Sequence, residues 1–285
     1  MVREFNLVNE KGQKYSLMDI QKSCLLTEPN GLGYAYQTTY EQLGNTFVIN
    51  LKKIQQGQIL GTLNFLSYDS FRNIVNFIES SEELKFEYTI PYKDVGSKTF
   101  YKDVEIQILG KSEIQPNGVI SENITIDCLS LWYSSSVARF EMESGENEIR
   151  WDFRWDSRFS DYSHRSLTYV NEGHIEAPIQ VIINGNVANP KIQLYIEGEL
   201  YQEVPLTITI NQYEKILYST KENDFYLLKQ NADGTKTNIF NLDVVSFNND
   251  NVIRLPKDKS IELRLVADND ISSAEITIFT YYKGV

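Results

Sequence analysis

Residues of the types that carry enzyme chemistry are present, but their spacing forms no recognisable catalytic arrangement. The chain has only two histidines, His164 and His174, and neither has a second histidine or a cysteine at metal-ligand spacing. This disfavours a zinc centre and a nucleophile activated by histidine. A glycosidase would need two carboxylates facing one cleft, and among 39 acidic residues no pair is distinguishable in the sequence. The sequence therefore predicts no enzyme activity, no metal and no cofactor.

One segment, Glu148 to Tyr162 (EIRWDFRWDSRFSDY), combines aromatic, basic and acidic side chains. In an extended conformation its aromatic residues fall on one face, and the charged residues between them fall on the other. This pattern favours a seam between two domains or two subunits, where aromatic side chains pack and arginines pair with acids. The residues predicted to form the seam are Trp151, Phe153, Trp155, Arg150, Arg154 and Arg158. A second interpretation stays open, because tryptophans beside aspartates also suit a sugar-binding site.

Net charge, cysteine usage and hydropathy exclude further classes of protein. The formal net charge is −12 with no strongly basic segment, whereas a nucleic-acid binder gains affinity from cations that displace counterions. We therefore expect no specific nucleic-acid binding. Cys24 and Cys128 lack a CxxC spacing and are predicted to be buried free thiols. No apolar stretch is long enough for a signal peptide or a membrane span, so we expect synthesis in a bacterial cytoplasm and no membrane insertion.

The elements that must position any site are predicted to be mainly β-strands. Aromatic residues make up 12% of the chain, and most stand in short runs with alternating apolar positions. In the first half these runs are 47–54, 59–66, 84–90, 99–109 and 119–131. One helix is predicted between them, because Phe71, Ile74, Val75 and Ile78 recur at helical spacing behind a cap at Ser67 or Asp69.

The length of 285 residues favours two domains. After Trp132 the alternation ends at Tyr-Ser-Ser-Ser, and strand signals resume beyond the aromatic segment. Eight strands with short turns follow, at 179–183, 191–196, 200–210, 215–218, 225–228, 238–242, 261–266 and 274–282. The predicted organisation is an N-terminal β-sandwich with one helix (1–135), an aromatic and arginine-rich junction (136–165) and a C-terminal galectin-like or jelly-roll β-sandwich (166–285).

Several strings, in order along nearly the whole chain, resemble a known family. They are 3–12 (REFNLVNEKG), 28–34 (EPNGLGY), 114–118 (IQPNG), 151–162 (WDFRWDSRFSDY), 173–179 (GHIEAPI), 182–190 (IINGNVANP) and 251–256 (NVIRLP). Together they are similar to the distal tail proteins, or siphovirus tail components, of long-tailed phages and prophages of Gram-positive bacteria. None of the strings is a catalytic motif, so the resemblance depends on their number and order.

The resemblance implies a structural protein of the virion tail. The N-terminal half would be a belt domain that joins six copies into a homohexameric ring, with DNA passing through it. The ring would connect the tail tube protein to a tail-tip or tail-lysin-type protein, and the outer C-terminal domain would carry receptor-binding proteins. Enlarged members of such families bind host cell-wall carbohydrate, but the second half of this chain shows no obvious insertion, which favours a hub.

Two rival functions remain open on the sequence alone. A carbohydrate-binding module for a bacterial cell-wall polysaccharide would present tyrosine or tryptophan on a sandwich face. A glycoside or peptidoglycan hydrolase would need the acid pair that the sequence does not distinguish. For the hub, an acidic ring lumen is expected, because like charge would keep DNA phosphates from adhering.

Overall fold

A computed structural model describes residues 3–93, 96–141, 165–240, 252–268, 271 and 273–285. The chain divides into two compact units: unit 1 holds residues 1–134 and 282–285, and unit 2 holds residues 135–281. The predicted predominance of β-strands is confirmed, with a single helix among the described residues. The predicted domain boundaries stay a prediction, and the last four residues, which were expected in the C-terminal domain, group with unit 1.

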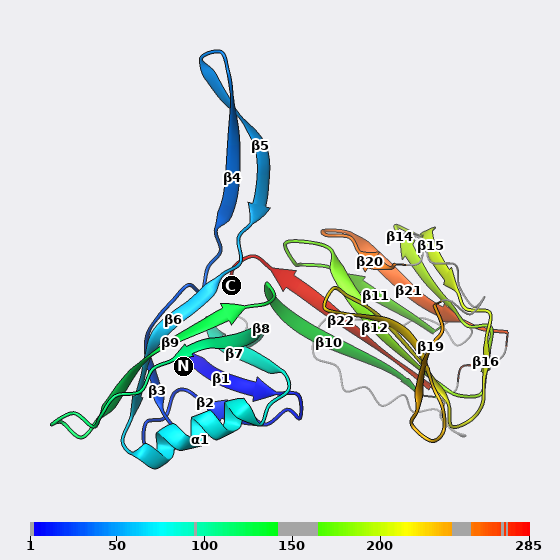
Figure 1. The fold of residues 1–285 in the computed structure, drawn as a ribbon. Coiled ribbons are helices and arrows are strands. Elements are labelled where there is room, and N and C mark those ends of the chain that lie inside the picture. The colour runs from blue at the N-terminus through cyan, green and yellow to red at the C-terminus, as the bar shows by residue number, and fades with distance from the viewer. Residues whose placement is uncertain (1–2, 94–95, 142–164, 241–251, 269–270, 272) are drawn as a thin grey trace. The chain divides into compact units, whose positions relative to one another are not determined.

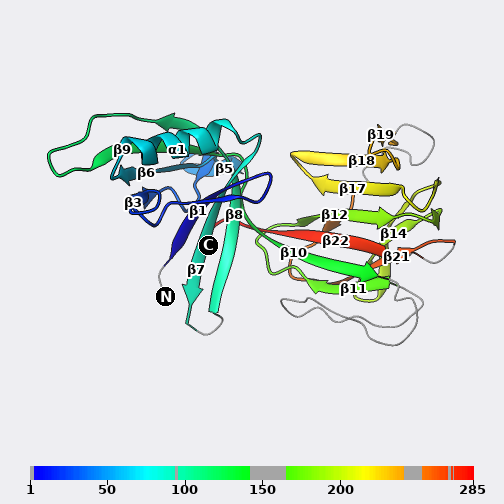
Figure 2. The ribbon, with the colours of Figure 1, turned by 90° about the horizontal axis from the view of Figure 1, so that it is seen from below.

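Unit 1 is an antiparallel sheet that folds back on its own core (Figures 1 and 2). Its strands follow the order β3-β6-β9-β8-β7-β1-β2, and β10 adds to β8. The bounds are β1 Glu4–Asn9, β2 Lys14–Ser16, β3 Leu25–Asn30, β4 Tyr36–Leu43, β5 Thr46–Ile54, β6 Gln58–Phe65, β7 Leu84–Tyr92, β8 Gly96–Leu109, β9 Ile120–Cys128 and β10 Trp132–Glu141. Alternate residues of these strands form the core, among them Phe5, Leu7, Ile59, Leu63, Phe86, Ile124 and Trp132.

The helix α1, Tyr68–Glu79, forms where the spacing of apolar residues predicts it. The side chain of Ser67 caps its first turn by accepting a hydrogen bond from the amide of Ser70. Ile74 is fully buried, and Phe71 packs against the core with its ring 5.5 Å from that of Phe65. The apolar stripe therefore covers one side of the core, as an amphipathic helix on a sheet does.

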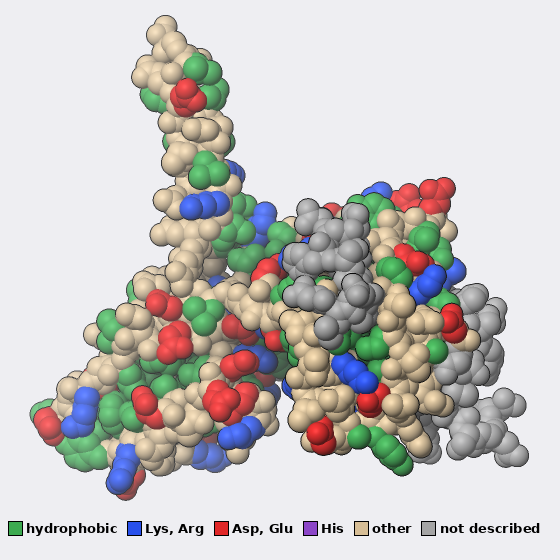
Figure 3. Space-filling model, turned by 45° about the vertical axis from the view of Figure 1, so that its right-hand side comes forward, with side chains coloured by type: hydrophobic (Ala, Val, Ile, Leu, Met, Phe, Trp, Pro, Cys, Tyr) green, Lys and Arg blue, Asp and Glu red, His purple; other side chains and the backbone are tan. Residues whose placement is uncertain are grey.

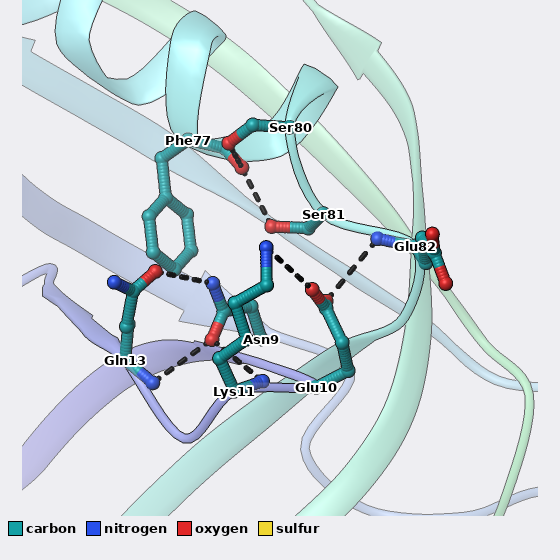
Figure 4. Close-up of polar contacts among 8 residues, drawn as sticks. All are labelled: Asn9, Glu10, Lys11, Gln13, Phe77, Ser80, Ser81 and Glu82. Atoms are coloured by element: carbon teal, nitrogen blue, oxygen red, sulfur yellow. Dashed lines mark hydrogen bonds and ion pairs between the residues drawn. The ribbon is translucent and has the colours of Figure 1, made fainter. Parts of the chain in front are cut away.

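The end of α1 is joined to the turn between β1 and β2 by polar contacts (Figure 4). The carboxylate of Glu10 accepts a hydrogen bond from the amide of Glu82 at 3.2 Å. The side chain of Asn9 accepts hydrogen bonds from the amides of Lys11 and Gln13 and so fixes the turn. These contacts satisfy backbone amides that neither the helix nor the strands use.

Unit 2 contains two antiparallel sheets that share one core. One sheet has the order β19-β18-β17-β12-β22-β10 (Figure 2). The other has the order β11-β21-β14-β15, and β13 pairs with β16. The bounds are β11 Arg165–Val170, β12 Ala177–Asn184, β13 Val187–Ala188, β14 Lys191–Ile196, β15 Glu199–Pro205, β16 Thr209–Ile210, β17 Lys215–Lys221, β18 Asp224–Gln230, β19 Lys236–Asn238, β20 Arg254–Leu255, β21 Ser260–Val266 and β22 Ser273–Tyr282. Alternate residues of both sheets are buried, among them Val181, Ile183, Ile192, Leu194, Leu263 and Leu265.

Three strand predictions differ from the structure. The alternation does not end after Trp132, because β10 continues through the serines to Glu141 with backbone pairing that needs no particular side chain. The strand expected over 200–210 is divided into β15 and β16, because the chain turns after Leu206, where the Ile208 amide bonds to the Leu206 carbonyl at 2.9 Å. The strand expected over 238–242 is replaced by β19 at Lys236–Asn238; Ile239 and Phe240 are not in a strand, and 241–242 lie outside the described residues. The strand expected over 47–54 is confirmed as β5, but its partner β4 was not predicted.

Candidate assembly surface

The six residues predicted to form the aromatic and arginine-rich seam lie outside the described residues. These are Trp151, Phe153, Trp155, Arg150, Arg154 and Arg158. The prediction of a seam is therefore untested. Elsewhere, His174 is exposed, while Cys24 and Cys128 are buried free thiols, as predicted.

The described residues contain no group of three or more histidine, cysteine or acidic side chains placed to hold a metal ion. No helix among them has the length and the apolar character to cross a membrane. Their most unusual surface is apolar, and it lies on the hairpin of β4 and β5.

The hairpin of β4 and β5 is a two-stranded sheet that pairs with none of the other described strands (Figure 1). It projects from the rest of unit 1 and carries hydrophobic side chains along its length (Figure 3). Six of these are large and exposed: Tyr40 63%, Leu43 55%, Phe47 69%, Val48 40%, Ile49 58% and Leu51 51%. A two-stranded hairpin is marginally stable alone in water, and an exposed apolar hairpin therefore indicates a surface that another molecule covers.

The strand register divides the apolar residues near the tip between the two faces. Tyr40 lies opposite Ile49 and Gln42 lies opposite Phe47, so Tyr40, Ile49 and Phe47 share one face. Leu43 and Val48 lie on the other. The pairing shifts between Thr39 and Tyr40, which is a bulge that increases the local twist of the ribbon. Both faces of the hairpin are thus available for contacts.

The base of the hairpin, in contrast, is held in place. The ring of Tyr36 lies 5.4 Å from that of Tyr34 and 4.2 Å from the Lys52 Nζ atom. Lys283, from the last residues of the chain, donates a hydrogen bond of 3.1 Å to the Tyr36 hydroxyl. The aromatic and cationic contacts fix where the hairpin leaves the unit and leave its tip uncovered.

The segment that leads into the hairpin is also fixed. Gly31 has a φ of +82°, and a Cβ there would lie 1.8 Å from the Gln58 carbonyl oxygen, so only glycine fits. Trp132 is fully buried, and its indole nitrogen donates a hydrogen bond of 2.8 Å to the Leu32 carbonyl. The hairpin therefore starts from a rigid point in the core of unit 1.

A second surface of unit 1 is the outer face of β3, β6 and β9. Lysine and arginine are absent from these three strands. Polar uncharged side chains dominate the face, and they bond across the strands: Asn64 donates to Thr27 at 3.0 Å and accepts from Ser121 at 2.7 Å. At one end of the face, Gln58 donates a hydrogen bond to Asp127. This cation-free face presents neutral and negative groups to whatever lies opposite it.

The sequence predicted one strand of the hairpin but not the candidate surface. Apolar residues stand at alternate positions of β5, and this pattern predicts that one face of the strand is buried. The exposed side chains of β4 and β5 show that neither face is covered within the chain. The sequence of β4, YQTTYEQL, has no alternation of apolar and polar residues, so this strand becomes evident only from its pairing with β5.

Comparison with known proteins gives a consistent result. Residues 4–129 match the family model for the N-terminal domain of distal tail proteins. A distal tail protein of Lactococcus phage SK1 is 24% identical over 250 residues, which is 80% of each chain. The matched N-terminal domain contains the hairpin and the cation-free face.

Two solved structures share the fold. A chain of the phage P2 baseplate, in its activated conformation with Ca, has a TM-score of 0.68 at 18% identity over 100% of both chains. The SPP1 Dit protein, described as a paradigm of the hub adsorption apparatus in phages that infect Gram-positive bacteria, has a TM-score of 0.57 at 10% identity. That likeness covers 96% of this chain and 98% of the other. Residues 4–129 thus belong to the family of distal tail protein N-terminal domains, and the curated relative and the shared fold agree in supporting a phage distal tail protein.

Proposed function

We propose that this phage tail protein acts as a homohexameric hub at the distal end of the tail. Its N-terminal half joins neighbouring copies into a ring that binds the tail tube protein on one side and a tail-tip or tail-lysin-type protein on the other. Its C-terminal half, beyond a junction near 136–165, carries receptor-binding proteins. The hub is structural and has no catalytic role. It is made in the host cytoplasm and becomes part of the virion tail.

The observation that carries the proposal is the uncovered β4–β5 hairpin. A ring of identical chains requires a heterologous contact, in which one surface of a protomer meets a different surface of its neighbour. A rigidly based hairpin with apolar side chains on its tip suits this role, because it reaches beyond its own unit. Eight-residue strands such as β4 extend about 25 Å at roughly 3.3 Å per residue, enough to reach an adjacent subunit.

The face of β3, β6 and β9 supports the passage of DNA. A channel wall that attracted phosphates would retain the nucleic acid, whereas one without cations does not. We therefore assign this cation-free face to the lumen. A solved ring whose lumen is lined by lysines would refute this assignment.

The ring is tested on the full chain by native mass spectrometry and negative-stain imaging, over a range of concentrations and with the tail tube protein added. We expect a particle of about six chains, whose abundance rises with concentration because assembly follows mass action. A chain that stays monomeric at every concentration, with and without the tube protein, would refute the hub. Imaging also shows whether the ring is closed or whether copies add in an open filament.

A further inference from the structure

A lysine is buried in the core of unit 1 without an acidic partner. Lys102 on β8 is only 3% exposed, and its ammonium lies 4.9 Å from the centre of the Trp132 ring. Within the described part of the chain, no carboxylate forms an ion pair with it. Burying a charged amine is costly unless it is paired, and an apolar side chain would fill the same space at lower cost.

The thiol of Cys128 lies beside this amine. Cys128 ends β9 and is 5% exposed, and Val104, opposite it on β8, shares a strand face with Lys102. The two reactive atoms border the same small space at Gly57. A Cβ at that glycine would lie 3.9 Å from Lys102 Nζ and 3.8 Å from Cys128 Sγ. The amine and the thiol therefore border the same point beside Gly57, and both side chains are almost fully buried.

Burial also changes the protonation of both groups. Burial lowers the pKa of the Lys102 amine, which increases the fraction of neutral amine, the form that acts as a nucleophile. Burial raises the pKa of the Cys128 thiol, and the nearby lysine charge opposes that rise. The pair thus combines a neutral nitrogen nucleophile with a thiol whose ionisation the lysine assists.

We propose that Cys128 and Lys102 form a covalent sulfur–nitrogen bond when the protein meets peroxide. In the first step the Cys128 sulfur attacks hydrogen peroxide, an S–O bond forms, the O–O bond breaks and one water leaves, which gives a sulfenic acid. In the second step Lys102 Nζ attacks that sulfur, an S–N bond forms, the S–O bond breaks and a second water leaves. The sulfur is oxidised by two electrons, the peroxide is reduced to two waters, and the chain loses two hydrogen atoms.

The other cysteine provides a control within the same chain. Cys24 is fully buried, and its sulfur lies 3.9 Å from the Ser16 carbonyl oxygen; among the described residues no lysine contributes to the pKa of this thiol. A sulfenic acid formed there would have no lysine amine among its described partners and so could not give the lysine crosslink. The crosslink is therefore specific to the Lys102–Cys128 pair and independent of the proposed hub function.

The test is mass spectrometry of the full-length protein after treatment with hydrogen peroxide, unfolding, alkylation of the remaining thiols and digestion with trypsin. Because trypsin cannot cleave after a modified Lys102, we expect residues 99–111 to appear joined to residues 112–139, the segment that contains Cys128. The joined pair should be lighter than the sum of its parts by about 2 Da, as expected for a sulfenamide. Dithiothreitol should separate it again, and Cys24 should be recovered as an alkylated thiol.

Three variants sharpen the result. Cys128→Ser and Lys102→Met should each abolish the joined pair, whereas Cys24→Ser should leave its yield unchanged. Recovery of Cys128 as a free thiol, or as sulfinic acid with Lys102 still cleaved by trypsin, would overturn the proposal. A joined pair that keeps an extra oxygen would overturn the direct sulfur–nitrogen bond. The mass of the joined pair and the chemical state of Cys128 are measured on the unaltered chain, so they decide the proposal even if a variant fails to fold.

Discussion

The double substitution Phe47→Thr and Ile49→Thr at the hairpin tip should prevent ring assembly without unfolding the protein. Both side chains lie on one face, with 69% and 58% of their surface exposed, so they contribute little within the single chain. Threonine is β-branched, a shape that strands favour, and surface changes of this kind alter stability by about 0.5 kcal/mol or less.

The effect on assembly can be calculated from the exposed area. Full burial of one such side chain contributes roughly 1.5–3 kcal/mol of free energy. Because about 60% of each side chain is exposed in the single chain, about 60% of that free energy is available when a subunit contact buries it. The pair should therefore contribute roughly 2–4 kcal/mol per contact, which weakens each contact about 30- to 1,000-fold. Because every subunit of a ring carries the change, closed rings should disappear at concentrations where the unchanged protein assembles.

Analytical ultracentrifugation in the presence of the tail tube protein measures this loss directly, with the thermal midpoint as a check on folding. The matched control is Leu200→Thr with Tyr201→Thr on β15 of unit 2, where the side chains are 51% and 68% exposed. The control should assemble normally. Rings that form equally well from both variants would refute the assignment of the contact to the hairpin tip.

Three further predictions concern the stability of unit 1. Trp132→Ala should destabilise it by about 3–5 kcal/mol, measured by denaturant unfolding, because the change empties a core site and leaves the Leu32 carbonyl unpaired; a loss below about 1 kcal/mol would contradict this. Ser67→Ala should cost about 1 kcal/mol in the same assay through loss of the helix cap, and Ser67→Asp should recover most of it. Burial raises the pKa of Cys24 from 9.0 to about 12 and that of Tyr101 from 10.0 to about 12, so the folded chain keeps protons that the unfolded chain releases. The contribution of these two groups to the free energy of unfolding is complete below pH 9 and is lost as the pH rises to 12. A thermal midpoint that stays constant between pH 9 and pH 12 would exclude this contribution.

Periodicity alone determined the helix and most of the strands. The spacing of Phe71, Ile74, Val75 and Ile78 can serve only a helix with one apolar face, and the structure places that face on the core. The alternation in β9 and β21 likewise gives a buried residue at almost every second position. The order of the family strings also pointed to the distal tail proteins.

Other features could not be predicted, because they depend on what lies opposite a residue and not on the residue itself. The same alternation describes a strand inside a sheet and a strand in the β4–β5 hairpin, and only the pairing shows that, among the described strands, β5 has β4 as its sole partner. The burial of Lys102 beside Cys128 follows from the register of β8 and β9, which brings distant positions together at Gly57. The sequence by itself determined the types and periods of the elements, since these follow from local backbone geometry. The tertiary structure alone decided which surfaces remain uncovered, because coverage is a property of long-range contacts.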